Sequence, residues 1–201
     1  MPEMFLCVPE DYYSSEMQAI IAKSISDSKN RWIYNIIQDR CPHTEIVLKR
    51  TPEWTLCRDG GSMDGKWLVV LHDTNIHSLR DLRSSHVPML IDMREQVRET
   101  LGKHYGRPLG SLVFFLHYMP SVFQLHVHVH IPEVFPSLGS ATEGQRIHSR
   151  RHMLKHVLRN LASDDLYYTK CILLANLCKN SKYAQVYSAM SFPASESLLF
   201  K

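Results

Sequence analysis

The sequence predicts an α+β fold, in which an antiparallel sheet carries packed helices. Short apolar runs at residues 44–50, 53–58, 66–72, 111–119 and 123–131 have the length and composition of strands. Stretches with helical apolar spacing lie before, between and after these runs. Strands that follow one another directly along a chain favour antiparallel pairing, and the helices then cover the sheet.

The first part of the chain predicts helix and then three strands. Residues 13–38 are mainly helical in pattern, and the polar stretch 26–30 divides them into two helices. A turn at Thr51-Pro52 joins the first two strands, 44–50 and 53–58. A loop rich in Gly and Asp at 58–65 leads into strand 66–72.

The second part predicts a long central helix. We expect it to begin with Ser84 or Ser85 as N-cap, to tolerate Pro88 in its first turn, and to end near Tyr105. The turn Pro120-Ser121 separates strands 111–119 and 123–131. The remaining elements are a loop at 132–145, a helix at 143–161, a strand at 171–177 and a short helix at 181–190.

Composition excludes several classes of protein. With 201 residues the chain fits one domain of ordinary size. A net charge of +3 is too small for general binding of long nucleic acid. The five widely spaced cysteines indicate a reducing, intracellular compartment. We expect a location in the cytoplasm, with the nucleus as an additional option. No apolar run is long enough to cross a membrane.

Three histidines alternate with valines in the stretch HVHVH, residues 126–130. Because side chains on a strand alternate between faces, His126, His128 and His130 share one face with Gln124. Three interpretations are open: a polar strand face with satisfied histidines, a zinc site built from alternating imidazoles, or a histidine that attacks phosphorus while its neighbours orient it.

Four segments, in order, carry a resemblance to a known family. The run LVFFLHYMPSVFQLHVHV (112–129) resembles the histidine-triad region of the scavenger mRNA-decapping enzymes. NIHSLRDL (75–82), the following HVPML (86–90) and RWIYNII (31–37) resemble further segments of that family. The resemblance covers about residues 10–190 and implies a histidine-triad-like sheet-and-helix domain that forms a homodimer.

The resemblance also implies a domain organisation and an activity. We expect a helical segment at 1–40 leading into a catalytic domain at 41–201, without the additional N-terminal domain of larger members. The implied reaction hydrolyses 7-methylguanosine cap dinucleotides or short capped oligonucleotides to 7-methyl-GMP and a nucleoside diphosphate, through a phosphohistidine. It needs no metal and no cofactor. The alternatives are a general histidine-triad nucleotide hydrolase or transferase, and a cap-binding module without activity.

The family's motif assigns roles to individual residues. A gapless match makes His126 the nucleophile, whereas sliding the motif by two residues makes His128 the nucleophile instead. His117, Ser121, His128 and Gln124 then match positions that bind or orient phosphate, with Gln124 replacing a histidine. His130 is an additional histidine without a family counterpart.

Trp32 and Asp59 match the positions that recognise the cap base. A tryptophan can stack on the positively charged methylated purine, and a carboxylate can accept hydrogen bonds from the guanine edge. The chain departs from the family nearby, since Gly60 and Gly61 replace a lysine and a glutamate position falls on Pro42, close to Glu45. Lys66 is a possible substitute for the lysine, and Trp67 is expected either beneath the pocket or in the core.

Overall fold

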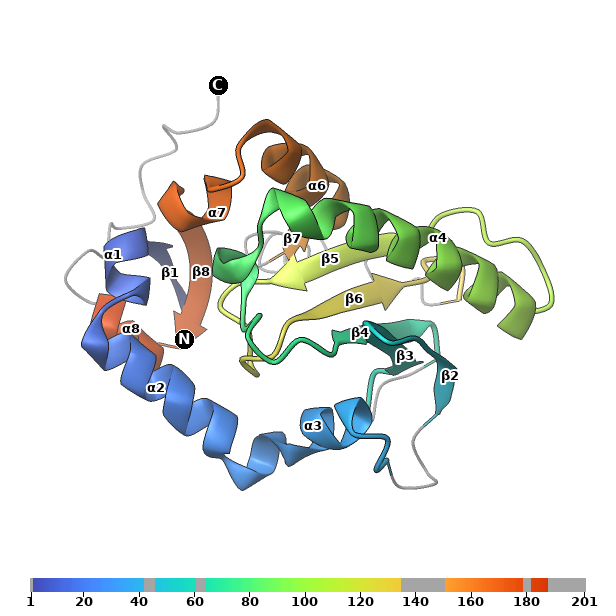
Figure 1. Ribbon diagram of the computed structural model, residues 1–201, viewed down its shortest axis with the longest axis horizontal. Coiled ribbons are helices and arrows are strands. Elements are labelled where there is room, and N and C mark those ends of the chain that lie inside the picture. Colours follow the sequence, from blue (N-terminus) through green and yellow to red (C-terminus); the bar gives the residue numbers. More distant parts are fainter. Residues whose placement is uncertain (1, 42–45, 61–63, 135–150, 179–181, 188–201) are drawn as a thin grey trace.

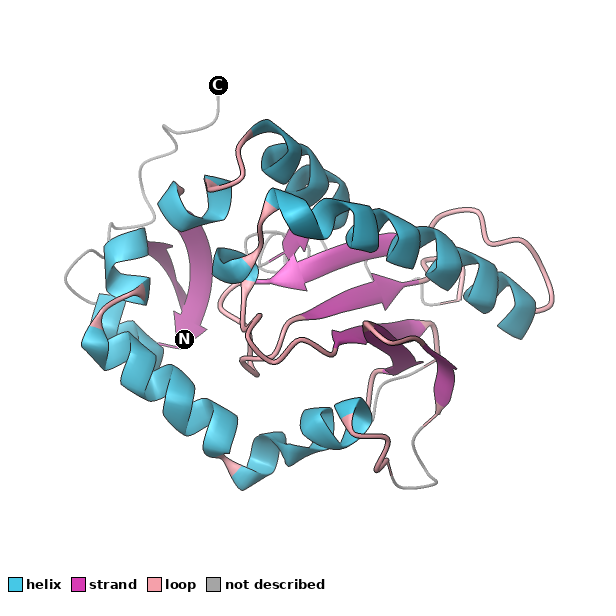
Figure 2. Ribbon diagram, in the orientation of Figure 1, coloured by secondary structure: helices cyan, strands magenta, loops and turns pink. Residues whose placement is uncertain are grey.

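The computed structural model describes residues 2–41, 46–60, 64–134, 151–178 and 182–187, and these confirm the α+β class (Figure 2). The strands are β1 (Pro2–Cys7), β2 (Val47–Arg50), β3 (Trp54–Arg58), β4 (Lys66–Leu71), β5 (Val113–His117), β6 (His126–His130), β7 (Arg151–Met153) and β8 (Leu173–Cys178). The α-helices are α1 (Pro9–Tyr12), α2 (Ser15–Ser26), α3 (Arg31–Ile37), α4 (Val87–His104), α6 (Leu154–Ser163), α7 (Tyr167–Lys170) and α8 (Lys182–Tyr187). The short 3₁₀ turns are η1 (Ser28–Asn30), η2 (Leu79–Asp81) and η3 (Ser84–His86).

Six strands form the main sheet in the order β2-β3-β4-β6-β5-β7, and each pair is antiparallel, as predicted (Figure 1). β6 lies at the centre, between β4 and β5. β8 is a strand as predicted, but it pairs with β1 in a separate two-stranded sheet. No helix in the described ranges has the length and apolar character needed to span a bilayer.

The two faces of the main sheet carry different cores. On one face, α4 and α6 pack against Val69, Val127 and Val129 in the larger core. On the other face, Ile33 and Ile36 of α3 pack in a smaller core with Cys57, Leu68 and Val70. This second face is the one that carries the histidines, so α3 borders the candidate site.

The predicted division of the first helical region is confirmed at Asp27. Its backbone is extended, and its side chain accepts a hydrogen bond from the backbone N–H of Lys29 at 3.0 Å. At the other end of α2, the hydroxyl of Ser14 accepts from the N–H of Met17 at 3.2 Å. Both contacts are side-chain caps, which satisfy backbone donors that a helix leaves without partners.

The prediction of one helix over 143–161 was wrong in its described part. Residues 151–153 form β7, which pairs with the edge of β5, and α6 begins only at Leu154. The apolar stripe of Leu154, Val157, Leu158 and Leu161 begins at that point as well. Residues 143–150 lie outside the described residues.

Three smaller predictions also needed correction, and one helix was missed. Ser84 and Ser85 belong to η3 and do not cap α4; the Ser84 hydroxyl donates to Asp165 at 2.6 Å. The strand predicted at 123–131 is shorter, because residues before His126 form bends. β1 lies in the stretch 1–40 that was predicted to be helical, and α7 was not predicted.

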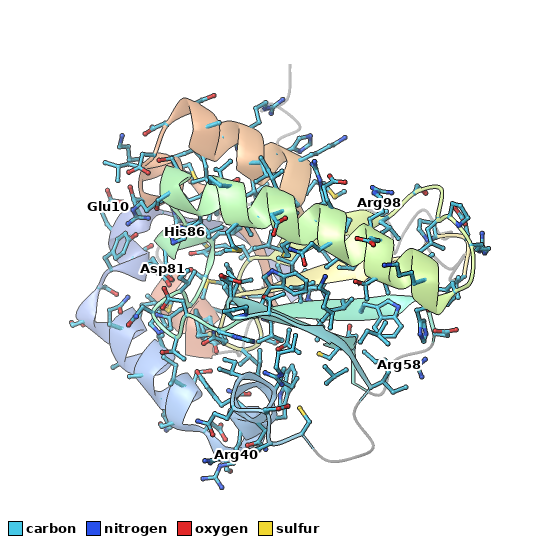
Figure 3. The ribbon with its side chains drawn as sticks, turned by 45° about the vertical axis from the view of Figure 1, so that its right-hand side comes forward. Glu10, Arg40, Arg58, Asp81, His86 and Arg98 are labelled. Carbon is cyan, nitrogen blue, oxygen red and sulfur yellow. The ribbon has the colours of Figure 1, made fainter. Side chains whose placement is uncertain are left out.

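Arg80, in the SLRDL segment (78–82), connects several parts of the fold by hydrogen bonds. Arg80 is fully buried, and its guanidinium donates to the carbonyl oxygens of Cys7, Tyr168 and Cys171 at 2.6–2.9 Å. It also donates to the hydroxyl of Tyr118 at 3.2 Å. Arg80 therefore ties the two-stranded sheet and α7 to the end of β5. Figure 3 shows Glu10, Asp81 and His86 on the side of the molecule near this junction.

Candidate active site

The strand register places the three histidines on one face, as predicted. His126 lies opposite Val70, His128 lies opposite Leu68 and Phe115, and His130 lies opposite Lys66. The intervening valines enter the larger core on the other face. The sheet thus holds a row of imidazoles beside α3.

His126 has the geometry of a neutral nucleophile. Its Nδ1 atom donates to the backbone carbonyl oxygen of Gln124 at 2.8 Å. A carbonyl oxygen can only accept, so Nδ1 carries the proton and Nε2 keeps its lone pair. Burial, and then the charge of His128, lower the pKa of His126 to about 4. The ring therefore stays unprotonated at neutral pH.

His128 has a different environment, between an aromatic ring and a carboxylate. Its ring is stacked on Phe115, with centroids 5.1 Å apart and an interplanar angle of 7°. Its centroid is 4.3 Å from that of His117 and 5.1 Å from that of His126. Nδ1 lies 3.7 Å from Oδ2 of Asp59. Burial raises the pKa of Asp59, but His128 outweighs it, and the net pKa is below the ordinary value.

The other residues predicted to contact phosphate have three different environments. His117 is half-buried at the end of β5, opposite Arg151, and Ser121 is exposed in the following turn. Gln124 is fully buried, and its Nε2 donates to the carbonyl oxygens of Leu71 and Asp73 at 2.8 and 3.0 Å. Both amide hydrogens are used, so this side chain has no donor left for a phosphate.

The two tryptophans have opposite environments. Trp32 on α3 is 40% exposed, whereas Trp67 is fully buried. Trp67 packs in the larger core, and its Nε1 donates to the hydroxyl of Tyr105 at 3.2 Å. Of the two positions left open for Trp67, the structure therefore supports the core. Lys66 lies opposite His130, while Gly61, Pro42 and Glu45 lie outside the described residues.

Comparison with known proteins agrees with this geometry. The family model described as "Scavenger mRNA decapping enzyme C-term binding" matches residues 31–142. The chain belongs to this family. The resemblance found in the sequence is thereby confirmed.

Several curated scavenger-family relatives carry the name m7GpppX diphosphatase. The rat protein (Rattus norvegicus) is 30% identical over 173 residues, which are 80% of this chain and 47% of that protein. The human protein (Homo sapiens) is 29% identical over 171 residues, 79% of this chain and 47% of its own length. The chain thus spans about half the length of these relatives. Among solved structures, the aprataxin ortholog Hnt3 in complex with DNA aligns with a TM-score of 0.49 and 16% identity, covering 81% of this chain and 94% of that one.

Two residues beside the histidine row were not identified from the sequence. Phe115 stacks on His128, and the Arg151 guanidinium lies 4.2 Å from the centroid of the Phe115 ring. The alternation of Phe115 with His117 along one strand was a usable signal for the first. Arg151 was hidden by the incorrect helix prediction. Burial lowers the pKa of Arg151.

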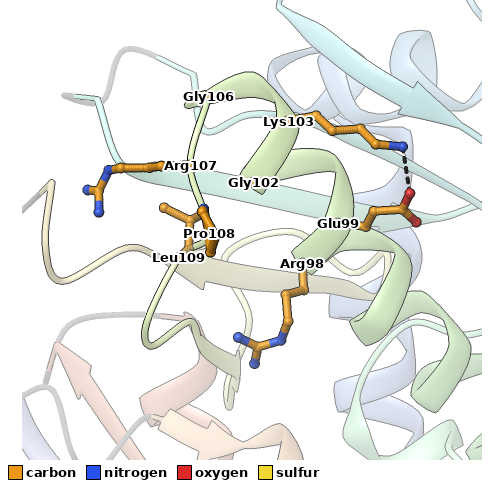
Figure 4. Close-up of a pocket in the computed structure, with 8 residues that line it drawn as sticks. All are labelled: Arg98, Glu99, Gly102, Lys103, Gly106, Arg107, Pro108 and Leu109. Atoms are coloured by element: carbon orange, nitrogen blue, oxygen red, sulfur yellow. Dashed lines mark hydrogen bonds and ion pairs between the residues drawn. The ribbon is translucent and has the colours of Figure 1, made fainter.

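The described ranges contain a pocket at the end of α4 but no candidate metal centre. No three His, Cys, Asp or Glu side chains there are arranged to hold a metal ion. A pocket of about 480 Å³ lies where α4 ends, and Figure 4 shows its lining. Arg98, Lys103 and Arg107 contribute to it, and Lys103 and Arg107 pair with Glu99 and Glu133. None of the histidines lines this pocket, so it is separate from the candidate active site.

Proposed function

We propose that this chain hydrolyses 7-methylguanosine cap dinucleotides or short capped oligonucleotides, in the decay of mRNA. The products are 7-methyl-GMP and a nucleoside diphosphate. The observation that carries the proposal is the unprotonated Nε2 of His126, fixed by the bond from Nδ1 to the Gln124 carbonyl. The names of the curated relatives, m7GpppX diphosphatase, support the choice of substrate.

The first chemical step forms a phosphohistidine. Nε2 of His126 attacks the phosphorus next to 7-methylguanosine, an N–P bond forms, and the P–O bond to the nucleoside diphosphate breaks with its electron pair on the departing oxygen. His128, His117 and Ser121 bind the phosphate oxygens. Much of the rate enhancement comes from positioning and from donors directed at developing charge.

Water completes the reaction in the second step. Its oxygen attacks the phosphorus, the N–P bond breaks, and 7-methyl-GMP leaves while His126 recovers its lone pair. Trp32 stacks on the methylated base, and Asp59 accepts from the guanine edge. Gln124 contributes its backbone carbonyl, which orients His126, while its side chain holds the preceding loop. The scheme uses only side chains and backbone of this chain, without a cofactor.

The test compares the wild type with His126→Ala and with His156→Ala, which changes an exposed histidine on α6. Each protein is incubated with a 7-methylguanosine cap dinucleotide, and the products are separated. We expect 7-methyl-GMP from the wild type and from His156→Ala, and none from His126→Ala. When the reaction is quenched without acid, mass spectrometry of the protein should locate the phosphoryl adduct on His126. Full turnover by His126→Ala, or an adduct on His128, contradicts the assignment.

A general nucleotide hydrolase or transferase is the second candidate. It is favoured by one specific observation: the carboxylate of Asp59 already has His128 as a neighbour at 3.7 Å, which competes with recognition of guanine. Equal rates on methylated and unmethylated dinucleotides would favour this candidate. Tight binding of a cap analogue without turnover or adduct would favour a cap-binding module instead.

Assembly and location are also part of the proposal. We expect a homodimer, in keeping with the family resemblance, and a location in the cytoplasm and the nucleus. Light scattering coupled to size exclusion tests the first, because the monomer has a mass of 23.3 kDa. Imaging of a tagged full-length protein tests the second.

A further inference from the structure

His126 and His128 are neighbours on one strand face, but one contacts a neutral group and the other lies beside an anionic one. His126 is 7% exposed and donates to a neutral carbonyl. His128 lies beside a carboxylate, 3.7 Å from Nδ1 to Oδ2 of Asp59, with side chains that are 13% and 28% exposed. Such a pair of environments separates two titratable groups of one kind into different protonation states.

We propose that Asp59 is a positioning residue for His128: it holds the ring as an imidazolium with Nδ1–H toward the carboxylate, so that Nε2–H donates to a phosphate oxygen. The phosphate is identified only through the proposed function, on which this part of the inference rests.

The surroundings of His128 support this role for its ring. Nε2 is buried and has no hydrogen-bond partner, which is costly for a polar atom unless a ligand supplies the partner. The stacked Phe115 restricts the ring plane, so Nε2 is held in one direction. Partial burial of both partners weakens solvent screening, and the Asp59–His128 attraction is stronger than that of an exposed pair.

Cationic groups beside the histidine row disfavour protonation of the His128 ring. Asp59 supplies the negative charge that opposes them. The rings of His117 on β5 and His126 on β6 contact the His128 ring. Farther along the row, Lys66 on β4 lies opposite His130, and Arg151 on β7 lies opposite His117. Of these groups, Lys66 and Arg151 are the cations, while His126 and His130 are neutral at pH 7. Without the carboxylate, the two cations disfavour an imidazolium at position 128.

A charged His128 also helps the nucleophile. Its charge is the second cause, after burial, of the low pKa of His126. The charge of Asp59 itself raises the pKa of His126, but burial and His128 outweigh it, so His126 stays neutral beside a charged His128.

The experiment measures the His128 ring directly. Nitrogen-15 NMR of the substrate-free protein follows its titration in the wild type, in Asp59→Asn and in Asp59→Glu. The control is Asp64→Asn, which removes a carboxylate that contacts Arg58 and Tyr105 instead. We expect Asp59→Asn to lower the fraction of protonated His128 rings at neutral pH several-fold. Asp59→Glu and Asp64→Asn should leave it near the wild-type value.

Kinetics provide the second readout. In Asp59→Asn, the alkaline limb of the pH profile of kcat on the cap dinucleotide should move to lower pH, together with the titration of the His128 ring. If Asp59 only binds the base, Asp59→Asn should raise KM and leave both the pH profile of kcat and the titration of the His128 ring unchanged. That result would overturn the inference. If Asp59→Asn changes the titration of His128 but the wild-type protein shows no turnover, the proposed function is refuted and the Asp59–His128 pairing stands.

Discussion

The Nδ1 atom of His126 lies 2.8 Å from the backbone carbonyl oxygen of Gln124, two residues earlier in the chain. Any residue at position 124 supplies this carbonyl. The replacement of a family histidine by Gln124 therefore does not affect the tautomer of His126, the proposed nucleophile. The contact fixes the tautomer and the direction of the His126 ring, while burial, which lowers its pKa to about 4, keeps the ring neutral.

His126→Asn should abolish turnover. Asparagine keeps a polar side chain of smaller size but has no nucleophilic nitrogen, and removal of a nucleophile costs roughly 10⁴-fold or more in kcat. Steady-state assays on the cap dinucleotide measure the loss, and circular dichroism checks the fold. A decrease of less than about tenfold would mean that another group attacks phosphorus.

Gln124→Ala should affect stability more than kcat. The substitution leaves the carbonyl oxygens of Leu71 and Asp73 without the Nε2 donor, at a cost of about 1–3 kcal/mol in the free energy of unfolding. The carbonyl that orients His126 remains. Urea unfolding should show the loss, while kcat stays within about tenfold of wild type. The opposite pattern would assign the amide to the phosphate.

Stability should fall as the pH falls from about 6.5 to about 4. Burial is the first cause that lowers the pKa of His126, His130 and His152 to about 4, from an ordinary value of 6.5. In this window the unfolded chain binds more protons than the folded chain, so acid favours unfolding. Each ring contributes a loss on the order of 1–2 kcal/mol at pH 5.

The measurement is urea unfolding at several pH values. His130→Phe is the informative variant, because Nδ1 of His130 is buried and makes no hydrogen bond. It should reduce the slope of stability against pH between 6.5 and 4. An unchanged slope would show that His130 takes up its proton in the folded state as readily as in the unfolded state.

The periodicity of the sequence was sufficient to predict the histidine face and most of the main sheet. Alternation with Val127 and Val129 fixes which side each His occupies, because the apolar side must be buried. β7 could not be predicted in this way. It is an edge strand of three residues, defined by its pairing with β5 and without an apolar pattern of its own.

Long-range contacts account for the other differences. β1 exists because Pro2–Cys7 pairs with β8 at the other end of the chain. The 3.7 Å approach of Asp59 to His128 depends on the register of β3, β4 and β6 together. The sequence predicted Asp59 as a site residue, but its contact with His128 comes from tertiary structure.

Arg80→Lys should destabilise the protein by roughly 3 kcal/mol or more. The guanidinium donates to three backbone carbonyls and to Tyr118, and a lysine ammonium cannot reproduce that planar arrangement. Buried acceptors left without donors cost about 1–3 kcal/mol each. Arg94→Lys is the matched control, since Arg94 pairs with Glu95 at the surface and the change should stay within about 0.5 kcal/mol. Equal midpoints in urea for both variants would contradict the bracing role.

Trp32→Ala and Trp67→Ala form a matched pair that separates binding from packing. Trp67 is fully buried in the larger core, and its truncation should cost about 3–5 kcal/mol of unfolding free energy. Trp32 is 40% exposed, so its loss should change stability little. Loss of stacking on a cationic base should instead weaken binding of a 7-methylguanosine nucleotide by about 0.5–2 kcal/mol, or roughly 2- to 30-fold in Kd. Fluorescence titration and urea unfolding of both variants test this, and unchanged affinity in Trp32→Ala would remove Trp32 from the base site.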